Sequence, residues 1–232
     1  MVDLGIPHRA DVTAEAFAAY CERRETESQL GQEHFVTWLL GDRCDGFFVE
    51  FGATDGLELS NTLVLERDFG WTGILAEPNR HYHSDLSLNR RCYIDQRAVF
   101  TETGRTVSFR ETELKMLSTI EQYADKDYHA ERRADGVWYD VTTVSLRDLL
   151  DTYDAPPEPD YLSIDTEGSE FDILSSYDWS RRFSVITVEH QYGDNRWPIL
   201  DLLQRQGYVR LLDDVSRWDD WFVLPERIPG WV

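Results

Sequence analysis

The chain has 232 residues, of which 23 are lysine or arginine and 44 are aspartate or glutamate, so its formal net charge is −21 at pH 7. This length allows one α/β domain with a sizeable core, and a hydrophobic content of 41% excludes an acidic disordered chain. The negative charge disfavours nucleic acids and anionic membrane surfaces as partners, because both need a positive protein surface. Neutral and cationic small molecules remain candidate ligands.

The N-terminus and the cysteines give no sign of export or of a structural metal. Met1–Ala10 has no apolar run behind a basic stretch, and no window approaches the ~20 apolar residues of a membrane span. Cys21, Cys44 and Cys92 form no C-x-x-C pair, which favours reduced thiols over a disulfide framework. We therefore expect a cytoplasmic protein.

The pattern of apolar residues predicts two regions. Residues 12–40 are predicted to be helical and to end at Gly41, so residues 1–45 are assigned to a helical extension packed on the core. Residues 46–232 form the second predicted region, in which buried strands alternate with helices. The strands are predicted at 46–51, 71–76, 92–99, 160–165 and 183–188. The helices are predicted at 60–69, 79–89, 145–153, 168–176 and 194–206. Such alternation indicates βαβ units and a parallel sheet, hence an α/β fold.

Two segments depart from this alternation. The long connection after the third strand contains short strands at 106–109 and 141–144, with a charged stretch at 121–136 that we expect to be a loop or an excursion over the sheet. At the C-terminus, 208–212 and 221–224 have no helix between them. They predict an antiparallel hairpin at the edge of the sheet.

Four predicted strands end in an acid: Glu50, Glu77, Asp165 and Glu189. In open parallel sheets, ligands bind beyond the carboxyl ends of the strands. Four separate acids at this edge therefore predict a ligand site.

The first acid precedes a glycine turn. Gly52 and Gly56 allow the backbone to turn sharply and to approach a ligand closely. Glu50 would repel a pyrophosphate, and no lysine or arginine within 49–62 compensates for it, whereas the same carboxylate attracts an ammonium or sulfonium group. The turn therefore favours S-adenosylmethionine over NAD, with a plain strand-to-helix turn as the alternative.

Glu77 stands at the end of the second predicted strand. An acid there accepts two hydrogen bonds from a ribose diol. Together with the glycine turn it predicts an adenosyl ligand. The alternative is that Glu77 caps a helix that follows Pro78.

Three ordered blocks of this sequence resemble the FkbM-type methyltransferases. They are Phe48–Gly56 with Leu59–Thr62, Gly70–Gly73 with Glu77–Asn79, and Leu162–Glu170 with Val188–His190. The resemblance implies a class I methyltransferase fold, which is a Rossmann-like three-layer sandwich. Its seven-stranded, mostly parallel sheet has the order 3-2-1-4-5-7-6, with strand 7 antiparallel. It also implies methylation of a hydroxyl on a small molecule such as a sugar, a cyclitol or a polyketide-type product.

The resemblance further implies a set of cofactor-binding residues. They are Glu50, Phe51, Gly52, Ala53, Asp55, Ser60, Asn61, Glu77, Pro78, Asn79, Ala98, Val99, Ser118 and Asp165. Within this set, Glu77 is expected to hold the ribose, and Ser60 and Asn61 to approach the carboxylate of the cofactor. Ala98 and Val99 are expected near the adenine.

An alcohol acceptor must lose its proton during methyl transfer, and three residues are candidates for that step. His190, with an ordinary pKa near ~6.5, is a candidate general base, and a structural histidine bonded to a carboxylate is the alternative. Asp165 and Glu189 are candidate bases, or candidate ligands of a divalent cation such as Mg²⁺. Glu167 and Glu170 are interpreted as charges at the start of a helix.

The predicted function is therefore O-methyl transfer from S-adenosylmethionine to a small-molecule acceptor. N-methylation of a small cationic acceptor, an NAD-dependent oxidoreductase or epimerase, and a catalytically silent binding module are the alternatives. The oligomeric state is left open between a monomer and a homodimer.

Overall fold

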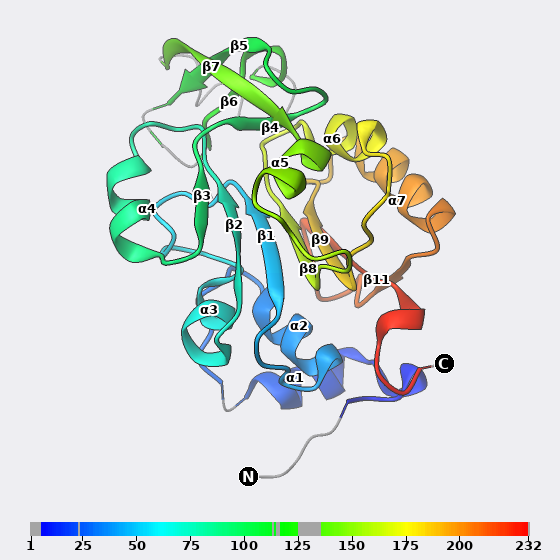
Figure 1. The fold of residues 1–232 in the computed structure, drawn as a ribbon. Helices are drawn as coiled ribbons and strands as arrows, with labels where there is room; N and C mark the ends of the chain where they lie inside the picture. Colours follow the sequence, from blue (N-terminus) through cyan, green and yellow to red (C-terminus); the bar gives the residue numbers. More distant parts are fainter. Residues whose placement is uncertain (1–5, 23, 113, 115–116, 125–135, 232) are drawn as a thin grey trace.

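A seven-stranded sheet forms the centre of the computed structural model, in the order β10-β11-β9-β8-β1-β2-β3 (Figure 1). The strands are β1 Phe47–Phe51, β2 Thr72–Ala76, β3 Tyr93–Asp95, β8 Tyr161–Ile164, β9 Val185–Glu189, β10 Val209–Leu211 and β11 Asp219–Val223. Counted along the chain within this sheet and read from β3, the order is 3-2-1-4-5-7-6. Only β11 runs antiparallel to its neighbours, β9 and β10. The predicted fold class, strand order and antiparallel seventh strand are confirmed. The structure describes residues 6–22, 24–112, 114, 117–124 and 136–231.

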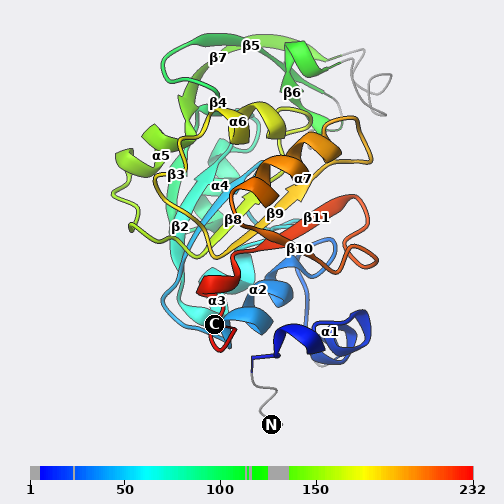
Figure 2. The same cartoon turned by 90° about the vertical axis from the view of Figure 1, so that its right-hand side faces the viewer.

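Helices cover both faces of this sheet and make three layers. They are α1 Ala14–Cys21, α2 Gln32–Leu40, α3 Leu63–Phe69, α4 His83–Asn89, α5 Leu146–Thr152, α6 Glu170–Ser176 and α7 Arg196–Arg205. Alternate side chains of β1 explain the layers, because Phe47, Val49 and Phe51 pack with α5, α6 and α7, whereas Phe48 packs with α1 to α4. Figure 2 shows α6 and α7 on the near side of the sheet. Short 3₁₀ helices occur at Arg9–Asp11, Glu121–Tyr123 and Pro225–Arg227.

The N-terminal helical region is two helices rather than one continuous segment. Thr13 caps α1 by accepting a hydrogen bond from the amide of Ala16 at 3.2 Å. Gly41 ends α2 in the left-handed conformation, as its position in the sequence predicted. Both helices share one hydrophobic cluster with Phe48 and Trp221 of the main sheet. The division at residues 45 and 46 stays a prediction.

The single strand predicted over 92–99 is wrong. Asp95 ends β3, because its carboxylate accepts a hydrogen bond from the backbone amide of Arg97 at 2.9 Å and also binds the Arg97 guanidinium. An aspartate that binds the amide two residues later forms a turn. The chain then leaves the main sheet and continues as β4, Ala98–Phe100.

β4 belongs to a second sheet, of order β4-β7-β5-β6, which we call the small sheet. Its other strands are β5 Thr106–Glu111, β6 Thr119–Ile120 and β7 Val137–Ser145. It lies beyond the carboxyl ends of the main strands, at the top of Figure 1. Of the loop predicted at 121–136, residues 125–135 lie outside the described residues. Within the described part of the chain, no helix has the length and apolar character that a membrane crossing requires.

Arg90, at the end of α4, is a buried arginine with a side chain that is 0% exposed. Its guanidinium donates hydrogen bonds of 2.7–3.1 Å to Glu66 Oε2, the carbonyl of Gly56, Ser60 Oγ and Thr62 Oγ1. The carboxylate of Glu50 lies 4.0 Å away. Arg90 therefore stabilises the loop between β1 and α3 through these hydrogen bonds.

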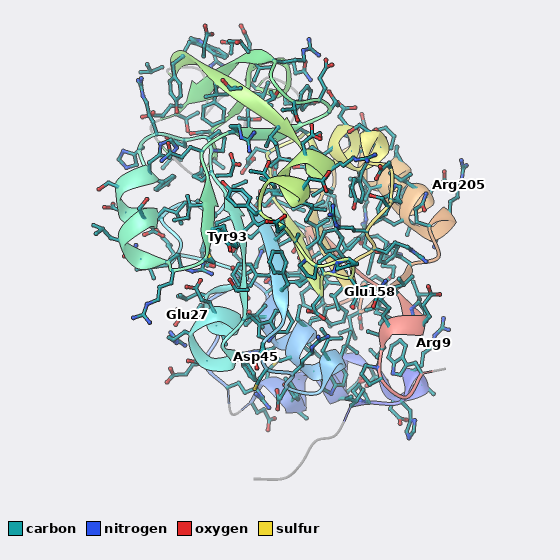
Figure 3. The ribbon with its side chains drawn as sticks, in the orientation of Figure 1. Arg9, Glu27, Asp45, Tyr93, Glu158 and Arg205 are labelled. Atoms are coloured by element: carbon teal, nitrogen blue, oxygen red, sulfur yellow. The ribbon has the colours of Figure 1, made fainter. Side chains whose placement is uncertain are left out.

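Arg90→Ala is expected to lower the free energy of unfolding by about 3–5 kcal/mol, because it leaves buried carboxylates without their cation. Arg67→Ala is the matched control, since Arg67 pairs with Asp68 and Glu27 at the surface, where Figure 3 labels Glu27. Exposed pairs contribute below about 1 kcal/mol. Urea unfolding of both variants checks the difference, and equal losses would contradict the assignment.

Candidate functional site

A cavity of about 680 Å³ lies at the carboxyl ends of β1, β2, β8 and β9, beneath the small sheet. The strand ends contribute Phe51, Ala76 and Glu189 to its lining, and β5 contributes Phe109. Ligands of open parallel sheets bind at this edge. The cavity is also large enough for a ligand of drug size.

Most of the residues predicted to bind a cofactor line this cavity. They are Glu50, Phe51, Gly52, Ala53, Ser60, Asn61, Glu77, Pro78, Ala98, Val99, Ser118 and Asp165. Asp55 and Asn79 stand outside the lining. Asp55 accepts hydrogen bonds from the amides of Leu57 and Glu58, both at 2.9 Å, and so shapes the turn. Asn79 is buried outside the lining of the cavity, and its side-chain nitrogen donates a hydrogen bond to Ser118 Oγ at 3.2 Å.

Glu77 is a buried carboxylate at the end of β2, only 5% exposed. It accepts hydrogen bonds from the amides of Thr54 at 2.9 Å and Asn79 at 2.7 Å. Burial raises the pKa of Glu77 to about 7. Because each carboxylate oxygen has two lone pairs, both oxygens keep acceptor capacity for a ligand. Glu77 is not the cap of α4, which begins six positions later, at His83.

Gly52 is required by a close approach between the ends of β1 and β8. Its φ is +75°, and a Cβ atom there would lie 2.1 Å from the carbonyl oxygen of Asp165. Thr54, Glu167 and Gln191 also have positive φ, at 48°, 57° and 44°. Backbone strain of this kind often occurs at functional sites, and these three residues line the cavity. Other described residues with positive φ, such as Asp42 and Trp179, do not line it, so the conformation alone does not mark the site.

Glu50 lines the cavity, but its carboxylate is occupied by the protein itself. It accepts hydrogen bonds from Ser60 Oγ at 3.2 Å, the amide of Asn61 at 2.8 Å and Thr62 Oγ1. Burial raises its pKa, and the nearby Arg90 charge opposes that effect. The geometry makes Glu50 an organiser of the loop.

Three acids at the ends of β8 and β9 form what we call the carboxylate cluster: Asp165, Glu167 and Glu189. Each offers an oxygen within 4.8 Å of the other two. Burial raises the pKa of Asp165 to about 7 and, with the neighbouring Asp165, keeps that of Glu189 well above its usual range. The side-chain amide of Gln191 donates to Glu167 at 3.1 Å and to Glu189 at 3.0 Å.

Glu167 differs from its prediction as a helix-start charge, because it precedes α6 and lines the cavity. Glu170 matches that prediction, since it stands in the first turn of α6 and accepts hydrogen bonds from the amides of Thr166 and Gly168. The sequence feature that could have placed Glu167 at the site is its spacing from Asp165, which follows the pattern D-x-E.

His190 does not line this cavity. Its Nδ1 accepts a hydrogen bond from the amide of Tyr192 at 2.9 Å, and its Nε2 lies 3.6 Å from Asp220 Oδ1. This placement fits the structural-histidine alternative. The acids Asp165 and Glu189 are then the candidate bases that face the cavity.

The sequence did not predict that the N-terminal region lines part of the cavity. Gln29 and Trp218 both line the cavity, and the indole N–H of Trp218 donates to Gln29 Oε1 at 3.1 Å. Next to them, Gln32 donates to Asp219 at 2.8 Å. No local pattern predicts such a contact, because it joins residues at opposite ends of the chain.

The strand order, with β11 antiparallel and the cavity at the strand ends, defines the class I methyltransferase fold. The chain belongs to the methyltransferase FkbM domain family, whose model matches residues 50–218. Membership of this family implies S-adenosylmethionine as the methyl donor and sets aside the oxidoreductase and epimerase alternatives.

Three solved structures that resemble this chain are methyltransferases of low sequence identity. Precorrin-6y C5,15-methyltransferase from Geobacter metallireducens is 14% identical, with a TM-score of 0.42, over 88% of this chain and 94% of that one. The METTL16 methyltransferase domain is 12% identical, with a TM-score of 0.46, over 84% and 67%. The C-terminal domain of the Rhodobacter capsulatus precorrin-6Y enzyme is 14% identical, with a TM-score of 0.41, over 95% and 93%. No curated protein sequence matches this chain.

Gly52→Ala is expected to destabilise the fold and to weaken S-adenosylhomocysteine binding at least about tenfold, because the new methyl group collides with the Asp165 backbone. Gly104→Ala is the matched control, since Gly104 has a φ of +84° and a Cβ atom there would meet nothing within 4 Å. It should show only the ~1–2 kcal/mol of left-handed strain and unchanged binding. Thermal unfolding and calorimetry check both, and equal behaviour would contradict the steric argument.

Glu77 predicts a pH dependence of stability. Its folded-state pKa rises from 4.5 to about 7, so between these values the folded protein holds a proton that the unfolded chain has released. This contribution to stability is fully present below pH 4.5 and is lost as the pH rises through about 7, amounting to about 3 kcal/mol. Urea unfolding across this range should give a flatter profile for Glu77→Gln than for the wild type. Parallel profiles would show that burial of Glu77 is not the cause.

Proposed function

We propose that the protein transfers a methyl group from S-adenosylmethionine to a hydroxyl of a small molecule, such as a sugar, a cyclitol or a polyketide-type product. The observation that carries this proposal is Glu77, buried at the end of β2 beside the glycine turn and inside the cavity. Family membership identifies the protein as a methyltransferase. The geometry of the cavity supports the proposed methyl donor and the proposed hydroxyl acceptor.

The lining fits the parts of this cofactor. Glu77 presents acceptors for a ribose diol, and Ala98 and Val99 give an apolar surface for the adenine. Glu50 and Asp165 bring carboxyl groups to the cavity, and a ligand with sulfonium and ammonium groups suits them because its positive charge favours their ionised form. When bound, the cofactor supplies a methyl group on a positively charged sulfur.

The acids beyond β8 and β9 support the proposed transfer to oxygen. A hydroxyl in the cavity needs an acceptor for its proton, and Asp165 has a pKa of about 7, close to the value that suits a general base at neutral pH. The proton passes from the hydroxyl to a carboxylate oxygen of Asp165, because the pKa of the neighbouring Glu189 lies well above its usual range and favours its protonated form. The walls hold the acceptor in line, and such positioning contributes at most ~7–11 kcal/mol to lowering the barrier.

The size of the cavity supports a small acceptor. About 680 Å³ must hold both the cofactor and the acceptor. A divalent cation at Asp165 and Glu189 is part of the same proposal, and when bound it would lower the pKa of an acceptor hydroxyl. N-methylation of a cationic acceptor remains the second candidate, because the carboxylate cluster suits a positive group.

Calorimetry with S-adenosylmethionine is the direct test of the donor. We expect micromolar binding to the wild type and a loss of about 10–100-fold in Glu77→Ala, because hydrogen bonds to a charged group contribute ~1.5–3 kcal/mol. Glu158→Ala, on the surface, is the control. Absence of binding to the wild type would refute the proposed donor.

The position of the new methyl group tests the acceptor. Incubation with methyl-labelled S-adenosylmethionine and a panel of sugars, aminosugars and cyclitols should give O-methyl products, identified by mass spectrometry and NMR. Asp165→Asn should abolish them while keeping cofactor affinity within about tenfold. Products methylated only on nitrogen would favour the second candidate.

A further inference from the structure

The turn that follows β9 carries an aromatic side chain at the opening of the cavity. Tyr192 lines the cavity, and it is also 65% exposed to solvent. A lining residue with so much exposed surface lies at the opening rather than in the interior. Trp218, which also lines the cavity, lies beside this turn, because its carbonyl oxygen accepts hydrogen bonds from the amides of His190 and Gln191 at 2.8 and 3.1 Å. The side chains of Tyr192 and Trp218 therefore belong to one wall.

The backbone of this turn has a conformation that is unfavourable for residues with a side chain. Gln191 and Tyr192 have φ values of 44° and 57°, so two successive residues are left-handed. Two hydrogen bonds to His190 oppose that cost. The amide of Gly193 donates to its carbonyl oxygen at 2.7 Å, and the amide of Tyr192 donates to its Nδ1 at 2.9 Å. His190 therefore stabilises the backbone that sets the direction of the Tyr192 side chain.

A buried acid links the two groups that lie beside the Tyr192 ring. The imidazole of His190 meets this ring edge to face, with centroids 5.4 Å apart, and Cζ of Arg196 lies 5.9 Å from its centroid. His190 Nε2 lies 3.6 Å from Oδ1 of the buried Asp220. The same carboxylate accepts hydrogen bonds from the Arg196 guanidinium at 2.9 and 3.2 Å. Tyr192 is thus an exposed aromatic residue whose backbone and neighbours are fixed.

The groups on this wall suit a ring that has hydroxyls on its rim and C–H bonds on its faces, as pyranose sugars and cyclitols do. The weakly positive C–H bonds of such a face pack on the negative face of an aromatic ring. Gln29, Glu167 and Gln191 line the same part of the cavity and carry hydrogen-bonding groups for the hydroxyls. A flat aromatic acceptor would shield these polar groups from water without replacing their hydrogen bonds.

From this arrangement we infer that Tyr192 binds the acceptor and selects a saturated polyol ring, and that His190 is a positioning residue that acts through Tyr192. The inference rests on the proposed function in one respect, which is that the cavity is the place of methyl transfer. It narrows the acceptor to sugars and cyclitols, held with a C–H face against the Tyr192 ring. His190 does not line the cavity, so it affects acceptor binding only through the backbone and ring of Tyr192.

Saturation-transfer NMR on the full chain measures this contact with defined probes. The ring polyols are methyl β-D-glucopyranoside, methyl α-D-mannopyranoside and scyllo-inositol. Sorbitol is the open-chain match of scyllo-inositol, with the same number of hydroxyls, and resorcinol is the flat aromatic probe. Each probe is titrated with and without saturating S-adenosylhomocysteine. We expect at least one ring polyol to bind at least about fivefold more tightly than sorbitol and resorcinol, with its C–H protons shifted upfield by the aromatic ring.

Variants of Tyr192 test the contact itself. Tyr192→Ala should weaken binding of that ring polyol at least about fivefold and remove the upfield shift, because the packing surface is lost. Tyr192→Phe keeps the ring and should retain both. Trp197→Ala is the matched control, since Trp197 is 63% exposed and lies 5.5 Å from the same Arg196 guanidinium without lining the cavity. It should change the affinity less than about twofold, and all three variants should bind S-adenosylhomocysteine as the wild type does.

Variants of His190 separate positioning from general stability. An asparagine side chain accepts the amide two residues later, as His190 Nδ1 does, so His190→Asn should keep most of the affinity that His190→Ala loses. In the double variant His190→Ala/Tyr192→Ala, the loss should equal that of Tyr192→Ala alone, because a residue that acts through another gives no additive effect. Unfolding curves establish that each variant is folded.

The outcomes separate this inference from the proposed function. Binding of S-adenosylhomocysteine without binding of any ring polyol overturns the inference alone, and so does ring-polyol binding that Tyr192→Ala leaves unchanged. Tighter binding of resorcinol than of every ring polyol overturns the selection of a polyol ring. Additive losses in the double variant overturn the positioning role of His190. Ring-polyol binding that depends on Tyr192, in a protein with no affinity for S-adenosylhomocysteine or S-adenosylmethionine, upholds the polyol site and refutes the proposed function.

Discussion

The guanidinium of Arg90 is the interaction on which the shape of the loop between β1 and α3, and with it one side of the cavity, depends. The loop from Gly56 to Thr62 contributes few apolar side chains of its own, so hydrogen bonds to one buried cation hold its shape. Those bonds also compensate the burial of Glu50 and Glu66. Because both charges and their partners come from the protein, the loop has its binding geometry before a ligand arrives, and ligand binding need not supply the energy of ordering it.

The side of the cavity at the ends of β8 and β9 shows the opposite arrangement. Asp165 and Glu189 lie close together and half-buried, with no arginine or lysine among the described cavity-lining residues, and desolvation raises both pKa values. Such an arrangement lowers the stability of the folded protein unless the two carboxyl groups share a proton or another positive group. In one half of the cavity, Arg90 compensates the charge of the acids and fixes the shape of the loop. In the other half, Asp165 and Glu189 have no such compensation from the described lining residues and are available for chemistry.

The main sheet could be predicted from the sequence because the patterns that indicate its strands are local. Buried runs such as 46–51 and acids at their ends follow from the alternation of side chains along a strand. The small sheet was only partly predictable, since β4 pairs with β7 more than forty positions later and only the Asp95 turn marks the departure. Glu167 was misassigned because its positive φ turns it from the helix toward the cavity, which propensity does not report. The placement of His190 depended on Asp220, a partner on another strand.

The bond between Gln29 and Trp218 spans 189 positions, and Gln29 precedes the segment that the family model matches. Closing so long a loop costs more entropy than closing a short one, and the cost grows with the logarithm of the loop length. During synthesis, residue 218 is added after all the residues of β1, β2 and β8. The part of the cavity wall that Gln29 and Trp218 form therefore cannot be made until the chain that lines the rest of the strand ends has been synthesised.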